Sequence, residues 1–237
     1  MAIDDLPGPV VNLLNVIGVP WPYINEDTVT QFATLTRQFG QAVQTTHQDA
    51  SQAIAGIAQA HQGASTQVMS SRWSTMSSEH VNELVTGCAV VADALDVAAG
   101  YIVVQKGEAI ATLIGMAIAF VADQAAAFAT LGASEAALPL IIDAAEQIVK
   151  SLVMDLEQYV IGQVIEAAAK PLFAKIEAAL TGLDWSQSSG GSGAVKSTGF
   201  SLDVGTARSH TAALRTHADT IRGHAQTFQE GVRGLGF

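Results

Sequence analysis

The chain has 237 residues, of which 49% are hydrophobic, 14% are charged and 6% are aromatic. This length and apolar content suffice for a real core, which excludes intrinsic disorder for most of the chain, and abundant alanine with only 6 prolines favours close-packed helices over β-sandwiches and barrels. The formal net charge of −11 argues against a phosphate-binding surface, so nucleic acid is not an expected partner.

The charge is unevenly distributed along the sequence. Residues 1–193 carry 6 basic and 19 acidic side chains, whereas residues 194–237 carry 5 and 3. This asymmetry indicates two pieces of separate origin. The single cysteine, Cys88, cannot form an internal disulfide, and its apolar neighbours predict a small buried hydrophobe rather than a reactive thiol.

Residues 1–24 contain four prolines and are predicted to form a lead-in, with one short turn of helix around Val10 to Ile17. Asp4 and Asp5 stand where a secretory signal peptide carries basic residues. We therefore expect that any export of the chain does not use the general secretory route.

A first long helix is expected after Asn25. Asn25 or Asp27 can cap it, and Glu26 beside Asp27 suits the positive end of the helix dipole. Apolar and small residues then alternate by three and four, which predicts one continuous packing seam. The seam consists of Val29, Phe32, Thr36, Phe39, Val43, Thr46, Ala50, Ala53, Ile57, Ala60 and Ala64.

A second seam follows a short polar connection at residues 70–75, which contains Trp73. Two matched seams with a short connection predict an antiparallel helical hairpin with Trp73 at its tip, and arms of about 40 residues make it elongated. The second seam consists of Val81, Leu84, Cys88, Val91, Leu95, Ala98 and Ile102.

The segment Ala109 to Ala122 is uncharged and apolar on all sides. Glu108 and Asp123 bracket it, and its length falls short of the roughly 20 residues that span a bilayer, so burial between helices is the expectation. A third helix, with Pro139 near its beginning, extends the hairpin. The predicted fold is all-α: an elongated antiparallel hairpin extended into a three- to four-helix bundle over residues 25–185.

Residues 186–199, which begin SQSSGGSG, are predicted to be a flexible linker. Residues 200–237 then form an amphipathic helix that Asp203 caps. This helix is too short to bury its apolar stripe alone, so we expect a partner for it in the same chain or in another. Its two core rows are predicted to be Val204, Thr211, Ala218, Ala225 and Val232, and Ala207, Leu214, Ile221, Phe228 and Leu235.

Catalytic and ligand-binding patterns are not recognised in the sequence. His210, His217 and His224 are seven residues apart, so successive rings are roughly 10 Å apart along a helix and cannot share a metal ion. They are expected to flank the tail helix's seam, as a solvated edge or as a pH-sensitive element of docking. The glycine clusters match no phosphate-binding loop. We expect no cofactor, no metal, no catalytic residues and no enzymatic activity.

Three stretches carry a resemblance to a known family. They are WPYINEDTVTQFATLTRQF in the first arm, SSRWSTMSSEHV at the turn, and KGEAIATLIGMAIAFVADQAAAFATLGASEAALPLIIDAAEQIV beyond it. With these features the chain resembles the WXG-like (Trp-x-Gly) helical hairpins of type VII secretion substrates, in the long form that leads actinobacterial polymorphic and channel-type toxins. Serine and threonine follow Trp73 where the family has glycine third. The tail FSLDVGTARSHTAALRTHADTIRGHAQTF resembles one arm of small type VII secretion-associated helical proteins.

The family's export signal is Tyr-x-x-x-Asp/Glu. Tyr23 and Asp27 have this spacing and are the candidate export signal, although their place before the first arm also fits a simple cap and lead-in. Tyr101 and Tyr159 are followed at the fourth position by glutamine.

The resemblance implies a non-enzymatic secretion and delivery module that pairs with a small helical WXG-type protein, or with itself, and engages the type VII machinery. It implies a cytoplasmic protein before export and a secreted or cell-surface protein afterwards. The alternatives are a membrane-inserting, pore-forming protein that uses residues 109–131, and a cytoplasmic chaperone or immunity partner. The expected interaction residues are Trp73, Trp21, Phe32, Phe39, Val81, Leu84, Leu214, Ile221 and Phe228.

Overall fold

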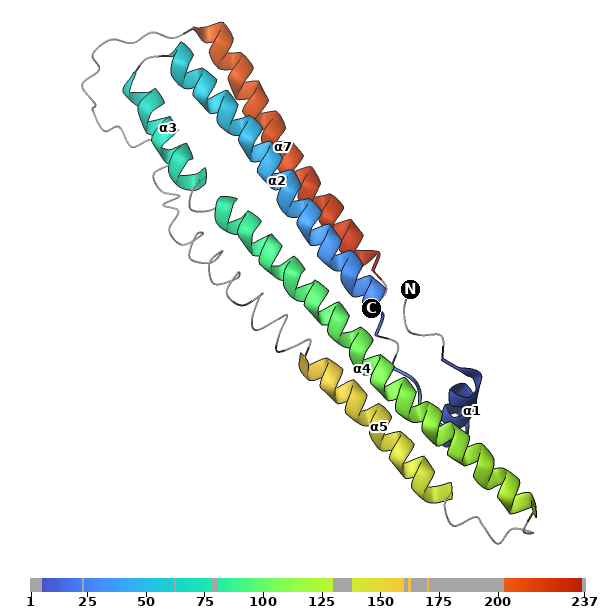
Figure 1. Cartoon of the computed structure of the whole chain (residues 1–237). Coiled ribbons are helices and arrows are strands. Elements are labelled where there is room, and N and C mark those ends of the chain that lie inside the picture. The colour runs from blue at the N-terminus through green and yellow to red at the C-terminus, as the bar shows by residue number, and fades with distance from the viewer. Residues whose placement is uncertain are drawn as a thin grey trace. The chain divides into compact units, whose positions relative to one another are not determined.

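The structure, a computed structural model, describes residues 6–22, 24–61, 63–77, 81–129, 138–159, 162, 170 and 203–235. These residues confirm the all-α prediction, since their regular elements are helices (Figure 1). The helices are α1 (Gly8–Ile17), α2 (Glu26–Ala60), α3 (Ala64–Met76), α4 (Asn82–Ala129), α5 (Leu138–Tyr159) and α7 (Val204–Arg233).

The chain folds into two compact units. The first, unit 1, combines Met1–Gln31, Ala94–Glu166 and Gly236–Phe237, and the second, unit 2, combines Phe32–Asp93 and Ala167–Leu235. Because α2 and α4 are long, each of them contributes residues to both units.

In unit 1, α1 turns the proline-rich lead-in into a full helix. It begins at Pro7 and Pro9. The first turn of a helix leaves backbone N–H groups without partners, and proline has no N–H, so it is favourable there. The helix ends at Gly18, which has the left-handed conformation with φ of 69°. The helix buries Val10 and Leu13 and contacts α5. The lead-in is therefore part of the core, and its helix is longer than the single turn expected.

The centre of unit 1 lies between α4 and α5, which run side by side in Figure 1. Tyr101 of α4 and Tyr159 of α5 stack with ring centroids 3.8 Å apart and planes 12° apart. Apolar residues at helical spacing complete this core from both helices. They are Ile102, Ala109, Leu113 and Ala117 of α4, and Ala145, Val149, Leu152 and Leu156 of α5.

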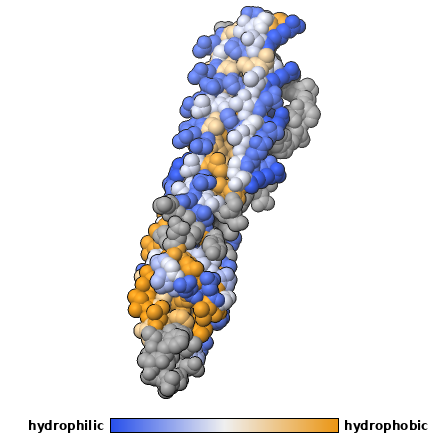
Figure 2. Space-filling view, turned by 90° about the vertical axis from the view of Figure 1, so that its right-hand side faces the viewer, coloured by the Kyte–Doolittle hydropathy of each residue, from blue (hydrophilic) through white to orange (hydrophobic). Residues whose placement is uncertain are grey.

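The apolar segment at 109–122 is buried along one stripe only. Ile118 and Val121 are 63% and 60% exposed, and Figure 2 shows apolar surface gathered on this part of the molecule. One helix in the part of the chain that the structure describes, Asn82–Ala122, is long and apolar enough to cross a membrane, judged by length and composition alone. The segment thus lies in a longer apolar stretch than the sequence interpretation assumed.

A buried ion pair in unit 1 joins the start of α2 to the middle of α4. Lys106 Nζ lies 3.0 Å from Glu26 Oε2, and the two side chains are 0% and 5% exposed. Asn25 caps α2, as expected, because its Oδ1 accepts a hydrogen bond from the backbone N–H of Thr28 at 3.1 Å. Glu26 therefore does more than complement the helix dipole: it fixes which residue of α4 lies opposite the beginning of α2.

In unit 2, one stripe of α2 is buried and consists largely of small residues. We call it the inner stripe of α2. Gly40 on this stripe meets Cys88 of α4, with only 3.0 Å between the place of an added Cβ and Cys88 Cβ. Arg37 and Asp93 form an ion pair at 2.7 Å, and the two contacts together show that α2 and α4 run antiparallel here. The inner stripe is Ala33, Thr36, Gly40, Val43, His47, Ala50 and Ile54.

The predicted first seam is therefore half wrong. Thr36, Val43 and Ala50 are buried as expected, but Phe32 and Phe39 are only half-buried and lie off the inner stripe. The physical reason is size, since Ala33 and Gly40 allow a close approach of two helices that phenylalanine would prevent. In the second predicted seam, Cys88, Leu95, Ala98 and Ile102 are buried, whereas Val81, Leu84 and Val91 are half-buried.

The predicted single turn at residues 70–75 is also wrong. Helix α2 ends at Ala60, and α3 begins at Ala64, so Trp73 lies inside a helix instead of at a turn. Gly63 precedes α3, and glycine has a low preference for helix interiors, so the chain breaks there. The first arm is shorter than expected, and a separate helix stands between the two arms.

The buried pair predicts a large effect of removing its cation. We expect Lys106→Met to lower the free energy of unfolding by about 3–5 kcal/mol, because the Glu26 carboxylate loses a buried ammonium partner. The double variant Glu26→Gln/Lys106→Met should recover most of that loss, as measured by urea unfolding. A loss below about 1 kcal/mol in the single variant, the value of an exposed pair, would contradict this prediction.

Candidate interaction interface

The tail helix α7 packs along α2 inside unit 2 (Figure 1). The paired residues ascend along α2 while they descend along α7, so the two helices are antiparallel. This supplies the partner that the amphipathic tail was expected to need, and it is in the same chain. The contacting pairs are Leu35 with Gly231, Phe39 with Phe228, Thr46 with His224, Gly56 with His210, and His61 with Asp203.

The residues of α2 in this contact lie beside the inner stripe and form a second surface, which we call the outer face of α2. Phe228 of α7 stacks on Phe39 with centroids 5.0 Å apart, and on Phe32 with centroids 6.4 Å apart. Aromatic pairs of this kind contribute about 0.5–1.5 kcal/mol beyond area burial. The outer face consists of Phe32, Leu35, Phe39, Ala42, Thr46 and Gly56.

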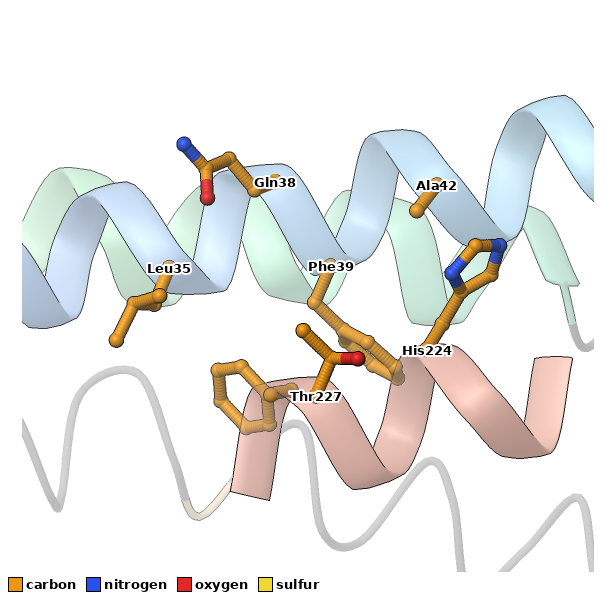
Figure 3. Close-up of a pocket in the computed structure, with 7 residues that line it drawn as sticks. Leu35, Gln38, Phe39, Ala42, His224 and Thr227 are labelled. Atoms are coloured by element: carbon orange, nitrogen blue, oxygen red, sulfur yellow. The ribbon is translucent and has the colours of Figure 1, made fainter. Parts of the chain in front are cut away.

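A groove with a volume of about 130 Å³ remains between α2 and α7 next to the aromatic cluster (Figure 3). Its lining is mostly apolar, with polar side chains from Gln38 of α2 and from His224 and Thr227 of α7. The two helices thus leave space between them beside their aromatic contact. The lining residues are Leu35, Gln38, Phe39, Ala42, His224, Thr227 and Phe228.

Polar contacts hold the start of α7. Asp203 caps the helix as predicted: its carboxylate accepts hydrogen bonds from the Thr206 hydroxyl and from the N–H groups of Gly205 and Thr206. These bonds, the Thr206 hydroxyl first, lower the pKa of the Asp203 carboxyl. The N–H of Asp203 donates to Nδ1 of His61 on the α2 side, at 3.2 Å.

Two glycines shape the contact at its opposite ends. A Cβ at Gly56 of α2 would lie 2.8 Å from the ring of His210, and a Cβ at Gly231 of α7 would lie 3.0 Å from Leu35. Each bulky side chain therefore sits over a position that has none. Farther along α7, His224 Nε2 lies 3.0 Å from the hydroxyl of Thr46.

The predicted core rows of α7 are half right. Leu214 and Phe228 are half-buried, but Val204 is 52% exposed and Thr211, Ala218 and Ala225 are exposed. The histidine row takes the second position of the seam, and His210, His217 and His224 are half-buried. Imidazole can pack its ring and still bond a hydroxyl, which suits an outer face that places Thr46 among apolar residues. The role of Gly56 and Gly231 in this contact was not predicted. Their only signal in the sequence is that each is a glycine within a helical pattern.

Trp73 packs locally in unit 2. Its ring stacks on His47 with centroids 5.1 Å apart and planes 15° apart, and its Nε1–H donates to Ser51 Oγ at 2.9 Å. His47 Nε2 lies 2.6 Å from Ser77 Oγ. Burial lowers the pKa of the His47 imidazole. The tryptophan therefore joins α3 to α2.

The remaining candidate residues are spread over the chain. Trp21 is 4% exposed in the core of unit 1, and Val81 and Leu84 are half-buried at the beginning of α4. Ile221 is 36% exposed. Of the candidate export signal, Asp27 lies in the first turn of α2, whereas Tyr23 lies outside the described residues.

Chemical sites are not evident in the described part of the chain. No group of three or more His, Cys, Asp or Glu side chains that could hold a metal ion is found among the described residues. Cys88 is buried, and burial raises the pKa of its thiol, which keeps it protonated and unreactive. The arrangement is suited to binding helices.

Comparison with known proteins identifies a family. The family model described as a WXG100-like domain matches residues 3–143, more than half of the chain. The match includes α1 to α4 and the beginning of α5, and it ends before α7. No curated protein and no solved structure matches the chain.

His47 predicts a pH dependence of stability. Its folded-state pKa is lowered, so the unfolded chain binds more protons once the pH falls to about 6.5, the ordinary histidine value. Its contribution is complete above that pH and is lost as the pH falls toward the folded-state pKa. We expect the free energy of unfolding to drop more between pH 7.5 and 5 in the wild type than in His47→Phe. Equal slopes in urea titrations of the two proteins would contradict this.

Proposed function

Because this chain belongs to the WXG100-like family of helical, type VII secretion-related proteins, we propose that it is a secretion substrate and delivery module that pairs through helical seams with a small helical partner. The supporting observation is the two-sided packing of α2. Its inner stripe is buried in unit 2, and its outer face accepts a second helix along the interval from Leu35 to His61.

The proposed role is one of binding without catalysis. The family is a non-enzymatic, secretion-associated one. Where polar side chains do cluster in unit 2, as around His47, they join helices: the ring packs on Trp73 and bonds Ser77. Two helix-packing surfaces on one helix are suited to assembly with other helices.

The proposed route is export by the type VII machinery without a signal peptide, from the cytoplasm to the cell surface or medium. Tyr23 and Asp27 are the proposed export signal. Asp27 lies in the first turn of α2, where a carboxylate is also favourable to the helix dipole, so its two roles have to be separated by experiment.

Co-expression tests the pairing. We expect the full chain to co-elute in size exclusion with a small helical WXG-type protein encoded beside it, and to reach the medium only when the secretion ATPase is active. Asp27→Ala should reduce export at least tenfold, whereas Asp49→Ala, an exposed acidic residue on the same helix, should not. Separate elution together with ATPase-independent appearance in the medium would contradict the proposed function.

A further inference from the structure

Helix α7 is an addition to the part of the chain that defines the family. The family match ends at residue 143, while α7 covers Val204–Arg233. Yet α7 lies on α2, which is inside the match, and it contacts the outer face from Leu35 to Gly56. A surface within the family domain is therefore covered by a helix from outside it.

The contact is loose compared with the inner stripe. No described residue of α7 is buried, whereas the inner stripe of α2 buries side chains almost completely. The α7 side of the seam carries His210, His217 and His224, and the groove of about 130 Å³ beside Phe228 is unfilled by the two helices. Stability from packing grows with the apolar area removed from water, so α7 gains less free energy from packing than the inner stripe of α2 does.

The outer face nevertheless selects its helix by shape. The ring of His210 lies over Gly56, and the side chain of Leu35 lies over Gly231, where an added Cβ would be 3.0 Å away and would displace Leu35. The two positions on α7 are 21 residues apart, which is three heptads, so both meet α2 only in one register. Phe228, 18 residues after His210, fills the aromatic position between them.

Charge favours the same kind of occupant. The segment 194–237 carries 5 basic and 3 acidic side chains, and the rest of the chain carries 6 basic and 19 acidic ones. A near-neutral or basic amphipathic helix is therefore attracted to this domain more than an acidic one.

We infer that the outer face of α2 is the docking surface for an amphipathic helix of the small partner protein, and that α7 occupies this surface in cis until the partner's helix displaces it. The displacing helix has a ring-bearing residue, an aromatic residue 18 positions later and a glycine 21 positions later, and it lies antiparallel to α2. The inference rests on the proposed function for the identity of the competitor.

A covalent lock tests displacement in the full chain. Leu35 Cγ lies 3.6 Å from the place of a Cβ at residue 231, so Leu35→Cys/Gly231→Cys brings two thiols within reach of a disulfide, with Cys88→Ala removing the native thiol. The probe is a fluorescent synthetic peptide of residues 203–235, titrated in fluorescence anisotropy. We expect the oxidised protein to bind the peptide at least tenfold more weakly than the same protein after reduction.

A release variant tests the opposite direction. In Gly231→Leu the added side chain meets Leu35, so the variant's own α7 should leave α2 and the peptide should bind at least tenfold more tightly than to the wild type, since the tethered competitor acts at an effective concentration of about millimolar. Gly223→Leu is the matched control, because nothing lies within 4 Å of a Cβ there. It should bind the peptide as the wild type does.

Three results would overturn the inference: equal peptide binding by the oxidised and reduced lock variant, no gain in Gly231→Leu, or a lock disulfide that joins two copies, seen as a doubled mass in light scattering, which would show that α7 is exchanged between copies. The titration uses neither secretion nor a natural partner. If the peptide displaces α7 but the full chain is not exported, the proposed function alone is contradicted. If the full chain is exported but the peptide does not displace α7, only this inference is contradicted.

Discussion

The packing of α2 on two sides is the constraint on which unit 2 depends. Small residues of the inner stripe, such as Ala33 and Gly40, let the backbone of another helix come close, while the phenylalanines next to them project onto the outer face. The inner stripe and the outer face are offset by a single residue, so α2 packs on two sides: α4 and, at His47, α3 lie on the inner stripe, and α7 lies on the outer face. Both α4 and α7 run antiparallel to α2.

Much of this arrangement follows from the sequence. Heptad spacing identifies α2, α4 and α7, Asn25 and Asp203 mark two helix starts, and Cys88 is recognisable as a buried position. The WXG-like features of the sequence also indicate the family that the match confirms. These signals are local, since a cap or a heptad is complete within a few turns of one helix.

The phase of each seam could not be predicted in the same way. The positions at 32 and 33 both continue a heptad from Val29, and the sequence favoured Phe32 by hydrophobicity although close packing required Ala33. On α7 the sequence places the histidine row at the edge of the seam, and its contacts with Thr46 and Gly56 join residues far apart in the chain, so no local pattern predicts them. The ion pair of Lys106 and Glu26 could not be predicted from the sequence for the same reason. Its members are 80 residues apart, and no short sequence pattern indicates that a charged side chain is buried.

The central claim is that α7 docks on the outer face of α2 through Phe39 and Phe228, and a double-mutant cycle measures this most directly. Urea unfolding of the wild type, Phe39→Ala, Phe228→Ala and the double variant gives the coupling free energy of the two rings. The stacked geometry predicts a favourable coupling of about 0.5–1.5 kcal/mol. Additive losses, with a coupling of zero within error, would show that the two helices do not meet there and would contradict the account.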